Sequence, residues 1–314
     1  MIIQAGFFTA PCGSDHMRIA ICTITRRRPE GLARLLRSLE KIEIDPGVTL
    51  RLVIVENDDP RPDAIPECSI PIHHVFEPRL GIPIARNRSI EEAISDADRL
   101  IFLDDDETVD PAWLSRLLAA EETYGSPVIT GPALPRFPDG SPAWAENSGV
   151  YVAPRYDTGT GRPWAFTHNT MIRTDVIRKG EFRFDETMGF TGGSDKEFFR
   201  RVAEAGHDII WADDAIAWEW YPLDRIRWRW VFQRSYRLGT NAVQAEHVVG
   251  IRGRIGLLGR AARFSARAIY RIIRHASAPG TAIALACWDI GRAAGLISGV
   301  LGSRYEEYAD RRDS

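Results

Sequence analysis

The sequence predicts an α/β fold in which helices cover both faces of a mostly parallel sheet. Continuous apolar runs rich in β-branched residues alternate with segments whose apolar residues recur at helical spacing. Three of these runs end directly in polar clusters, TRRR, ENDD and DDDE, which begin at positions 25, 56 and 104. Because ligands bind at the carboxyl ends of strands in such sheets, we expect the three clusters to share one crevice.

The elements follow in order along the chain. Apolar runs predict strands at residues 18–24, 50–56, 72–77 and 99–103. Helical spacing predicts helices at residues 29–39, 83–95, 110–122 and 194–206. Pro29 suits a first helical turn, Asp110 is expected to cap the third helix, and Ser194 or Asp195 the fourth. The irregular, Gly- and Pro-rich stretch 136–165 is predicted to be a functional loop or lid.

Composition and cysteine spacing favour a soluble protein of a reducing compartment. The 314 residues are 44% apolar and 26% charged, which is ordinary for a globular chain. The four cysteines are widely spaced and form no CxxC, so we expect neither a disulfide framework nor a zinc site. We expect residues 1–16 to be a leader or a cloning remnant, residues 17–240 to form the main domain, and residues 241–314 to form a tail.

The stretch FLDDDETVDPAWL places four acids side by side, Asp104 to Glu107, directly after an apolar run. Repulsion disfavours such a cluster unless something positive binds there. Carboxylate oxygens suit Mg²⁺ or Mn²⁺, and such an ion can also hold a substrate diphosphate. The alternative is a solvated acidic turn. Absence of GxGxxG and GxxxxGK patterns disfavours dinucleotide oxidoreductases and P-loop enzymes.

An ordered set of motifs resembles the inverting glycosyltransferases of family 2, which have the GT-A fold. The motifs are CTITRRRPEGLARLLRSL, VIVEND, RLGIPIARNRSIEEA, FLDDDETVDPAWL, THNTMIRTDVI, GGSDKEFFRRVAEAG and RWRWVFQRSYRLG. The resemblance covers residues 18–240 and is nearest to bacterial exopolysaccharide transferases of the succinoglycan type. It implies that residues 17–240 are a catalytic domain. It also implies transfer of a sugar from a nucleotide-sugar, with a UDP-sugar favoured, to a saccharide or lipid-linked saccharide in surface polysaccharide synthesis.

The resemblance also implies a donor site with a divalent cation, Mn²⁺ or Mg²⁺. Asp106 matches the metal-binding acid, and Glu219 stands where the family often has a histidine ligand. Glu219 could instead be a surface acid among aromatic residues. The positions that match nucleotide- and donor-binding residues are Thr23, Thr25, Glu56, Arg86, Asn87, Asp104 and Asp105. For Arg86, an ion pair with Glu91 or Glu92 on its own helix is the alternative.

Asp195 matches the family's catalytic aspartate, which would deprotonate an acceptor hydroxyl. Ser194 precedes it where the family often has glutamate, and a helix cap is the other interpretation of Asp195. Further residues are hypothesised to line the acceptor or sugar pocket, with core packing or a structural role as the alternative. They are Trp144, Trp164, His168, Asn169 and Trp218.

The tail is basic and amphipathic. Residues 225–275 hold twelve arginines and one acid, Glu246. Five of these arginines fall on one side of a helix, with apolar residues opposite: Arg260, Arg263, Arg267, Arg271 and Arg274. Such a helix is typical of an anchor on an anionic membrane surface, and the alternative is packing on the main domain. The apolar segment 281–301 carries Asp289 and Arg292 near its centre, so it is predicted to lie on a surface or to pack rather than to span a membrane.

These features predict a peripheral protein on the inner face of the cytoplasmic membrane that does not bind nucleic acid. A nucleotidyltransferase would use the same metal and diphosphate chemistry, but the first strand lacks the GxGxR-like start that it would need. A non-enzymatic nucleic-acid-binding module would explain the arginines but leaves the acidic cluster and Asp195 unexplained.

Overall fold

The computed structural model describes residues 16–61, 65–153, 155–189, 192–245 and 251–302. The chain divides into two compact units, each described by itself. The first comprises Met1–Leu134, Ala153–Gly189 and Gly193–Glu219. The second comprises Pro135–Val152, Phe190–Gly192 and Trp220–Ser314. Part of the predicted loop 136–165 therefore belongs to the second unit.

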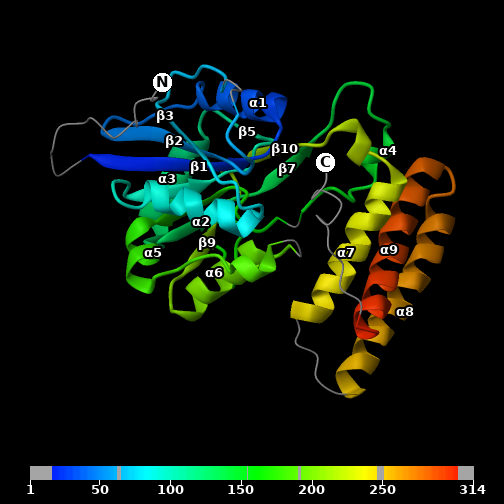
Figure 1. Cartoon of the computed structure of the whole chain (residues 1–314). Coiled ribbons are helices and arrows are strands. Elements are labelled where there is room, and N and C mark those ends of the chain that lie inside the picture. Colours follow the sequence, from blue (N-terminus) through cyan, green and yellow to red (C-terminus); the bar gives the residue numbers. More distant parts are fainter. Residues whose placement is uncertain (1–15, 62–64, 154, 190–191, 246–250, 303–314) are drawn as a thin grey trace. The chain divides into compact units, whose positions relative to one another are not determined.

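The first unit is built on a sheet that, within the described residues, has seven strands in the order β3-β2-β1-β4-β8-β6-β9 (Figure 1). Its strands are β1 (Met17–Thr25), β2 (Val48–Glu56), β3 (Ile72–Phe76), β4 (Arg99–Phe102), β6 (Val128–Thr130), β8 (Thr170–Arg173) and β9 (Ile209–Trp211). β8 runs antiparallel to β4 and β6, and the other neighbours are parallel. The mostly parallel α/β sheet predicted from the sequence is confirmed.

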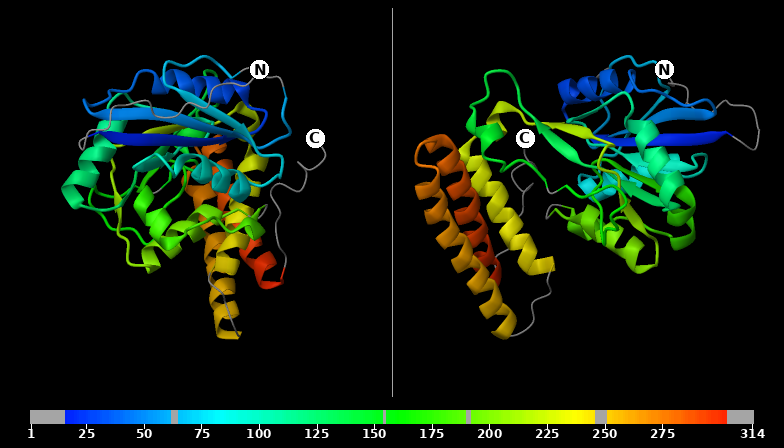
Figure 2. Two further views of the ribbon diagram at one scale, coloured as in Figure 1. Left: turned by 60° about the vertical axis from the view of Figure 1, so that its left-hand side comes forward. Right: turned by 180° about the vertical axis from the view of Figure 1, so that it is seen from behind.

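Helices cover both faces of this sheet because successive side chains of a strand point to opposite sides (Figure 2). On β1, Ile19 and Ile21 pack into one core, and Ala20 and Cys22 into the other. The first core includes α1 (Pro29–Leu39) and α3 (Trp113–Tyr124). The second includes α2 (Ile82–Ala93), α5 (Thr174–Gly180) and α6 (Ser194–Glu204). The short helix η1 (Glu186–Met188) precedes α6.

Two predicted helix caps are wrong. α3 begins at Trp113 without a side-chain cap, and Asp110 Oδ1 instead accepts a hydrogen bond from Trp218 Nε1 at 3.0 Å. α6 begins after Gly193, whose φ of 90° lies in the left-handed region that glycine adopts without strain. Neither Ser194 nor Asp195 caps α6, because both lie inside its first turn.

A three-stranded sheet joins β5 (Glu107–Val109), β10 (Ala217–Trp220) and β7 (Ala133–Arg136) in the order β5-β10-β7 among the described residues. β5 and β10 are antiparallel, and Glu107 is paired with Glu219. Two acids that are far apart in the sequence are therefore neighbours.

The second unit consists of helices and an aromatic cluster. Its helices are α4 (Trp144–Asn147), η2 (Leu223–Arg225), α7 (Trp228–Ala245), α8 (Ile251–Arg274) and α9 (Pro279–Val300). α9 packs against both α7 and α8. Gly291 and Gly295 allow close approach to α7, because a Cβ at Gly295 would lie 2.0 Å from the Tyr236 carbonyl oxygen. The aromatic cluster includes Tyr151, which stacks on Trp230 at 5.6 Å.

α9 is the described helix that is long and apolar enough to cross a membrane by length and composition alone, and 44% of its apolar window is buried. Asp289, near its centre, is fully buried and paired with Arg267 and Arg271 of α8. Of the two predicted placements, lying on a surface or packing, the structure shows α9 packed through Asp289, and Arg267 and Arg271 of α8 neutralise that buried charge.

Candidate functional site

The polar ends of β1, β2 and β4 meet at one edge of the sheet. Thr25, at the end of β1, is in register with Glu56 at the end of β2, and β4 pairs with the other side of β1. Thr25 Oγ1 donates a hydrogen bond to Asp105 Oδ2 at 2.7 Å, which ties β1 to the acidic turn that follows β4. The expected shared crevice is thus supported by direct contacts.

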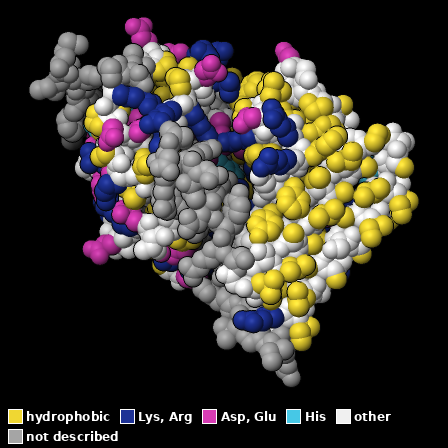
Figure 3. Space-filling model, turned by 45° about the vertical axis from the view of Figure 1, so that its right-hand side comes forward, with side chains coloured by type: hydrophobic (Ala, Val, Ile, Leu, Met, Phe, Trp, Pro, Cys, Tyr) yellow, Lys and Arg dark blue, Asp and Glu magenta, His cyan; other side chains and the backbone are white. Residues whose placement is uncertain are grey.

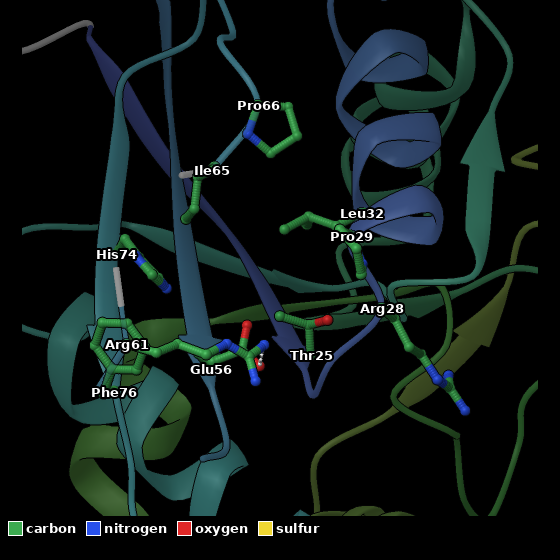
Figure 4. Close-up of a pocket in the computed structure, with 10 residues that line it drawn as sticks. All are labelled: Thr25, Arg28, Pro29, Leu32, Glu56, Arg61, Ile65, Pro66, His74 and Phe76. Carbon is green, nitrogen blue, oxygen red and sulfur yellow. Dashed lines mark hydrogen bonds and ion pairs between the residues drawn. The ribbon is translucent and has the colours of Figure 1, made fainter. Parts of the chain in front are cut away.

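A small pocket lies beside the ends of β1, β2 and β3 (Figure 4). Leu32, Ile65 and Phe76 give it apolar walls. Glu56 accepts hydrogen bonds from the backbone N–H of Arg27 at 3.0 Å and from Arg61 Nη2 at 2.9 Å. Apolar walls with a carboxylate and a guanidinium at one end suit a flat ring with a polar edge.

The acidic turn is held by an arginine that the sequence reasoning did not assign to the site. Arg28 Nη1 donates to Asp105 Oδ1 at 2.9 Å and to Asp106 Oδ2 at 3.2 Å. Burial raises the pKa of Asp105 to about 6, although the charge of Arg28 opposes that rise. Arg28 belongs to the TRRR cluster at the end of β1. Its position at a strand end is the sequence feature from which its place in the site could have been predicted.

Glu107 is a second residue that the sequence reasoning left out of the site. Its side chain is buried, and Oε2 accepts a hydrogen bond from the backbone N–H of Asp104 at 2.8 Å. In the described part of the chain, Oε1 is buried without a hydrogen-bond partner. Burial raises the pKa of Glu107 well above its usual value, and the charges of Asp104, Asp106 and Glu219 raise it further.

The acidic turn and Glu219 offer carboxylate oxygens of the kind that a divalent cation binds. Within the described ranges, no three or more His, Cys, Asp or Glu side chains are arranged to hold a metal alone. However, Mg²⁺ sites commonly use one or two carboxylates and take their remaining ligands from phosphates and water. The unpartnered Oε1 of Glu107 and the nearby charges of Asp106 and Glu219 fit such an incomplete oxygen site.

Asp104 brings together residues from three other segments. Arg86 Nη2 lies 3.8 Å from Asp104 Oδ1, and Arg86 Nη1 donates to Ser194 Oγ at 3.4 Å. Desolvation raises the pKa of Asp104; Arg86 and His168 oppose the rise, and Asp106 and Asp195 add to it. Arg86 therefore contacts Asp104 and Ser194, residues of two other segments that the sequence analysis considered separately. The predicted alternative for Arg86, an ion pair within its own helix, is wrong.

Asp195 is half-buried in the first turn of α6. Its Oδ1 accepts a hydrogen bond from the backbone N–H of Lys196 at 2.8 Å. Because Gly193 occupies the N-cap position, the capping interpretation does not explain this carboxylate. Lys196 in turn lies 5.1 Å from the ring centre of Trp164.

Two predicted site residues instead support the backbone. Asn87 donates to the Phe184 carbonyl at 3.0 Å and accepts from the Phe184 N–H at 2.8 Å, so it fixes the segment before η1. Asn169 is fully buried; its Oδ1 accepts from Trp113 Nε1 at 2.7 Å and its Nδ2 donates to the carbonyl of Ala215. We therefore reassign Asn169 from the sugar pocket to a structural support. Thr23 is also buried, on β1.

The predicted aromatic residues are dispersed. Trp144 belongs to the second unit, where it packs against Tyr151 and Trp228, as the core-packing alternative predicted. Trp218 bonds to Asp110 through its indole nitrogen. Trp164 lies near Lys196, the residue after the predicted general base, and ring contacts connect Trp164 through Phe166 to His168.

Comparison with known proteins gives the following. Residues 20–180 match the family described as glycosyl transferase family 2. The succinoglycan biosynthesis protein ExoM of Rhizobium meliloti (strain 1021) is 32% identical over 308 residues, which cover 94% of this chain and 96% of that protein. The crystal structure of S. aureus TarS 1–349 matches with a TM-score of 0.52 at 12% identity, over 92% of this chain and 93% of that one. TarS 1–349 in complex with UDP-GlcNAc has the same values. At this identity the TarS match shows the fold alone.

Proposed function

We propose that this chain, which belongs to glycosyl transferase family 2, transfers a sugar with inversion from a nucleotide-sugar to a saccharide acceptor. That it is a glycosyltransferase follows from the family, and its GT-A fold is shared with TarS. The observation that supports the mechanism best is the pair of contacts made by Arg86, with Asp104 at 3.8 Å and with Ser194 at 3.4 Å, which links the turn after β4 to the helix that carries Asp195.

The donor is a nucleotide-sugar, and UDP-sugars are favoured because TarS structures contain UDP and UDP-GlcNAc. The nucleobase of the donor occupies the pocket beside Glu56, between Leu32, Ile65 and Phe76. Asp106 and Glu219 would hold Mn²⁺ or Mg²⁺, and buried Glu107 is paired with Glu219 on the neighbouring strand β5. When bound, the cation neutralises the charge of the leaving diphosphate.

Asp195 acts as the general base. Its carboxylate removes the proton from an acceptor hydroxyl, and that oxygen forms a bond to the anomeric carbon of the donor sugar. The bond from this carbon to the diphosphate oxygen breaks, and the electron pair leaves with the nucleoside diphosphate. Attack opposite the leaving group inverts the anomeric configuration. Arg86, between Asp104 and Ser194, helps to set the position of the first turn of α6.

The acceptor is a saccharide of a surface polysaccharide, and we place it on a lipid carrier at the inner face of the cytoplasmic membrane. The name of ExoM, a succinoglycan biosynthesis protein, supports the polysaccharide class. The test is release of nucleoside diphosphate from a panel of nucleotide-sugars with Mn²⁺ and extracted lipid-linked saccharides. Release of pyrophosphate from a nucleoside triphosphate supplied with a sugar 1-phosphate, in place of the nucleotide-sugars, would instead indicate nucleotidyl transfer.

A further inference from the structure

The outer side of α8 is apolar and exposed. Its exposed apolar side chains include Ile255, Leu258, Ile269, Ile272 and Ile273. Ile273 is 71% exposed and Ile269 is 63% exposed. At about 100° per residue, the five side chains fall within a sector of roughly 100°. This is a continuous stripe, whereas an exposed isoleucine on its own would need no explanation.

α9 adds a second stripe. Ile283, Ile290 and Ile297 recur every seven residues and are all exposed. α8 and α9 form a helical hairpin that packs through Leu257 and Leu296, among others. For antiparallel helices with these buried positions, helical geometry places both stripes on the same side of the hairpin. Figure 3 shows a broad apolar surface over these helices. We call the two stripes together the apolar face.

An ion pair fixes the rotation of α8 that exposes this face. Arg267 Nη2 lies 2.6 Å from Asp289 Oδ1, and Arg271 Nη1 lies 3.2 Å from Oδ2. Asp289 is fully buried, and removing the partners of a buried charge is strongly destabilising. Turning the apolar stripe of α8 inward would break both contacts. The exposed apolar side chains are thus held outward by the packing of the unit itself.

The charge of the hairpin indicates what covers the face. Residues 251–302 contain eight arginines and a single acid, Asp289, which is buried. Arg254, Arg263 and Arg274 are exposed on α8. Apolar side chains flanked by arginines match an anionic bilayer, in which the acyl region takes the apolar groups and the headgroups take the cations. Two copies that paired through this face would bring their arginines together, which is unfavourable.

We propose that the apolar face of α8 and α9 is the surface by which this chain docks on an anionic lipid bilayer. This deepens the proposed acceptor class, because a lipid-linked saccharide is reached from such a surface. It also revises the expectation from the sequence: the apolar stripe inserts, while Arg267 and Arg271 hold the hairpin together. Docking is measured without donor or acceptor, so its failure would leave the transferase assignment standing.

The test is flotation of the full chain with vesicles of phosphatidylcholine, with and without phosphatidylglycerol. We expect wild-type protein to float with the anionic vesicles. Ile269→Gln/Ile273→Gln/Ile290→Gln should lower vesicle partitioning at least about tenfold, because three apolar side chains no longer enter the bilayer. The same variant should keep wild-type thermal stability and UDP binding. Ile44→Gln, at a side chain that is 46% exposed in the first unit, is the matched control and should float normally.

A second variant separates the apolar contribution from the charges. Arg254→Gln/Arg263→Gln/Arg274→Gln should reduce the preference for phosphatidylglycerol while sparing Asp289 and its partners. The proposal is overturned if wild-type protein stays in solution with anionic vesicles, or if the triple isoleucine variant floats as well as wild type. It is also overturned if light scattering shows that wild-type protein is a dimer, that the triple isoleucine variant is a monomer, and that added vesicles do not dissociate the wild-type dimer.

Discussion

Asp104 and Asp195 are two carboxylates of one site with different surroundings. Asp104 has Arg86 at 3.8 Å and follows β4 after one intervening residue, Leu103. Asp195 is half-buried on α6 and uses Oδ1 for a bond to the backbone of Lys196, so its carboxylate has a second oxygen for a hydroxyl proton. This difference suits Asp104 to donor binding and Asp195 to proton removal.

Asp195→Asn is expected to fold and to bind UDP with Mn²⁺ but to lose sugar transfer. An amide keeps the bond to Lys196 but cannot take a proton, and general-base catalysis typically contributes about 10²–10⁴-fold in rate. Initial rates at saturating donor measure the loss. Glu197→Gln, on the same helix turn and paired with Arg201, is the control and should keep near-normal activity. Retention of most activity by Asp195→Asn would rule out the assigned role.

Asp106→Ala is expected to abolish Mn²⁺-dependent binding of UDP, because the metal loses its attachment to the protein. Calorimetry with and without Mn²⁺ measures it. Arg28→Gln should increase the affinity for Mn²⁺ measured without UDP. The reason is that the guanidinium, which contacts Asp106 at 3.2 Å, is removed. Unchanged Mn²⁺-dependent UDP affinity in Asp106→Ala would contradict the metal assignment.

At the scale of elements, apolar periodicity was sufficient for β1 to β4 but did not predict β6, β8 and β9, the short strands that complete the sheet. The four predicted strands agree with β1 to β4 to within two residues at each end, because a strand buried on both faces is apolar throughout. The rotation of α8 was not predictable in the same way. Its apolar and basic sides are equally periodic, and the choice between them depends on Asp289, which lies on another helix.

The site residues that belong to a sequence motif could be predicted, but those whose position depends on tertiary packing could not. The position of Asp104 near the end of β4 was predictable from sequence order, whereas the contacts of Arg86 with Asp104 and Ser194 depend on how α2 and α6 pack. Glu107 differs, because its burial depends on pairing with β10, more than a hundred residues later in the chain. Asn169 had the right residue type for a sugar pocket, but its φ of 58° and its bond to Trp113 place its side chain in the interior.

The contact between α7 and α9 predicts a sharp contrast between two glycines. In Gly295→Ala the new Cβ would lie 2.0 Å from the Tyr236 carbonyl oxygen, so the helices must separate. We expect a loss of about 1–3 kcal/mol in the free energy of unfolding, measured by chemical denaturation. Gly256→Ala on α8, where a Cβ would meet nothing within 4 Å, should be neutral or stabilising by up to about 1 kcal/mol. Equal effects of the two changes would contradict the close packing.

At the scale of the whole molecule, ligand binding should appear as thermal stabilisation. Mn²⁺ with UDP is expected to raise the melting temperature, since a ligand at a hundred times its Kd stabilises the native state by about 2.7 kcal/mol. Oligonucleotides should not raise it, because the arginines of α8 are assigned to the hairpin and to lipid. Stabilisation by oligonucleotides but not by UDP would favour the nucleic-acid-binding alternative.

The most direct test of inverting sugar transfer is the anomeric configuration of the product. The chain is incubated with the nucleotide-sugar and acceptor that support release of nucleoside diphosphate, and the new linkage is assigned by NMR from its anomeric proton coupling. We predict a linkage opposite in configuration to the donor, formed by wild-type protein and absent with Asp195→Asn. A product that retains the donor configuration, or one still formed by Asp195→Asn, would contradict the account.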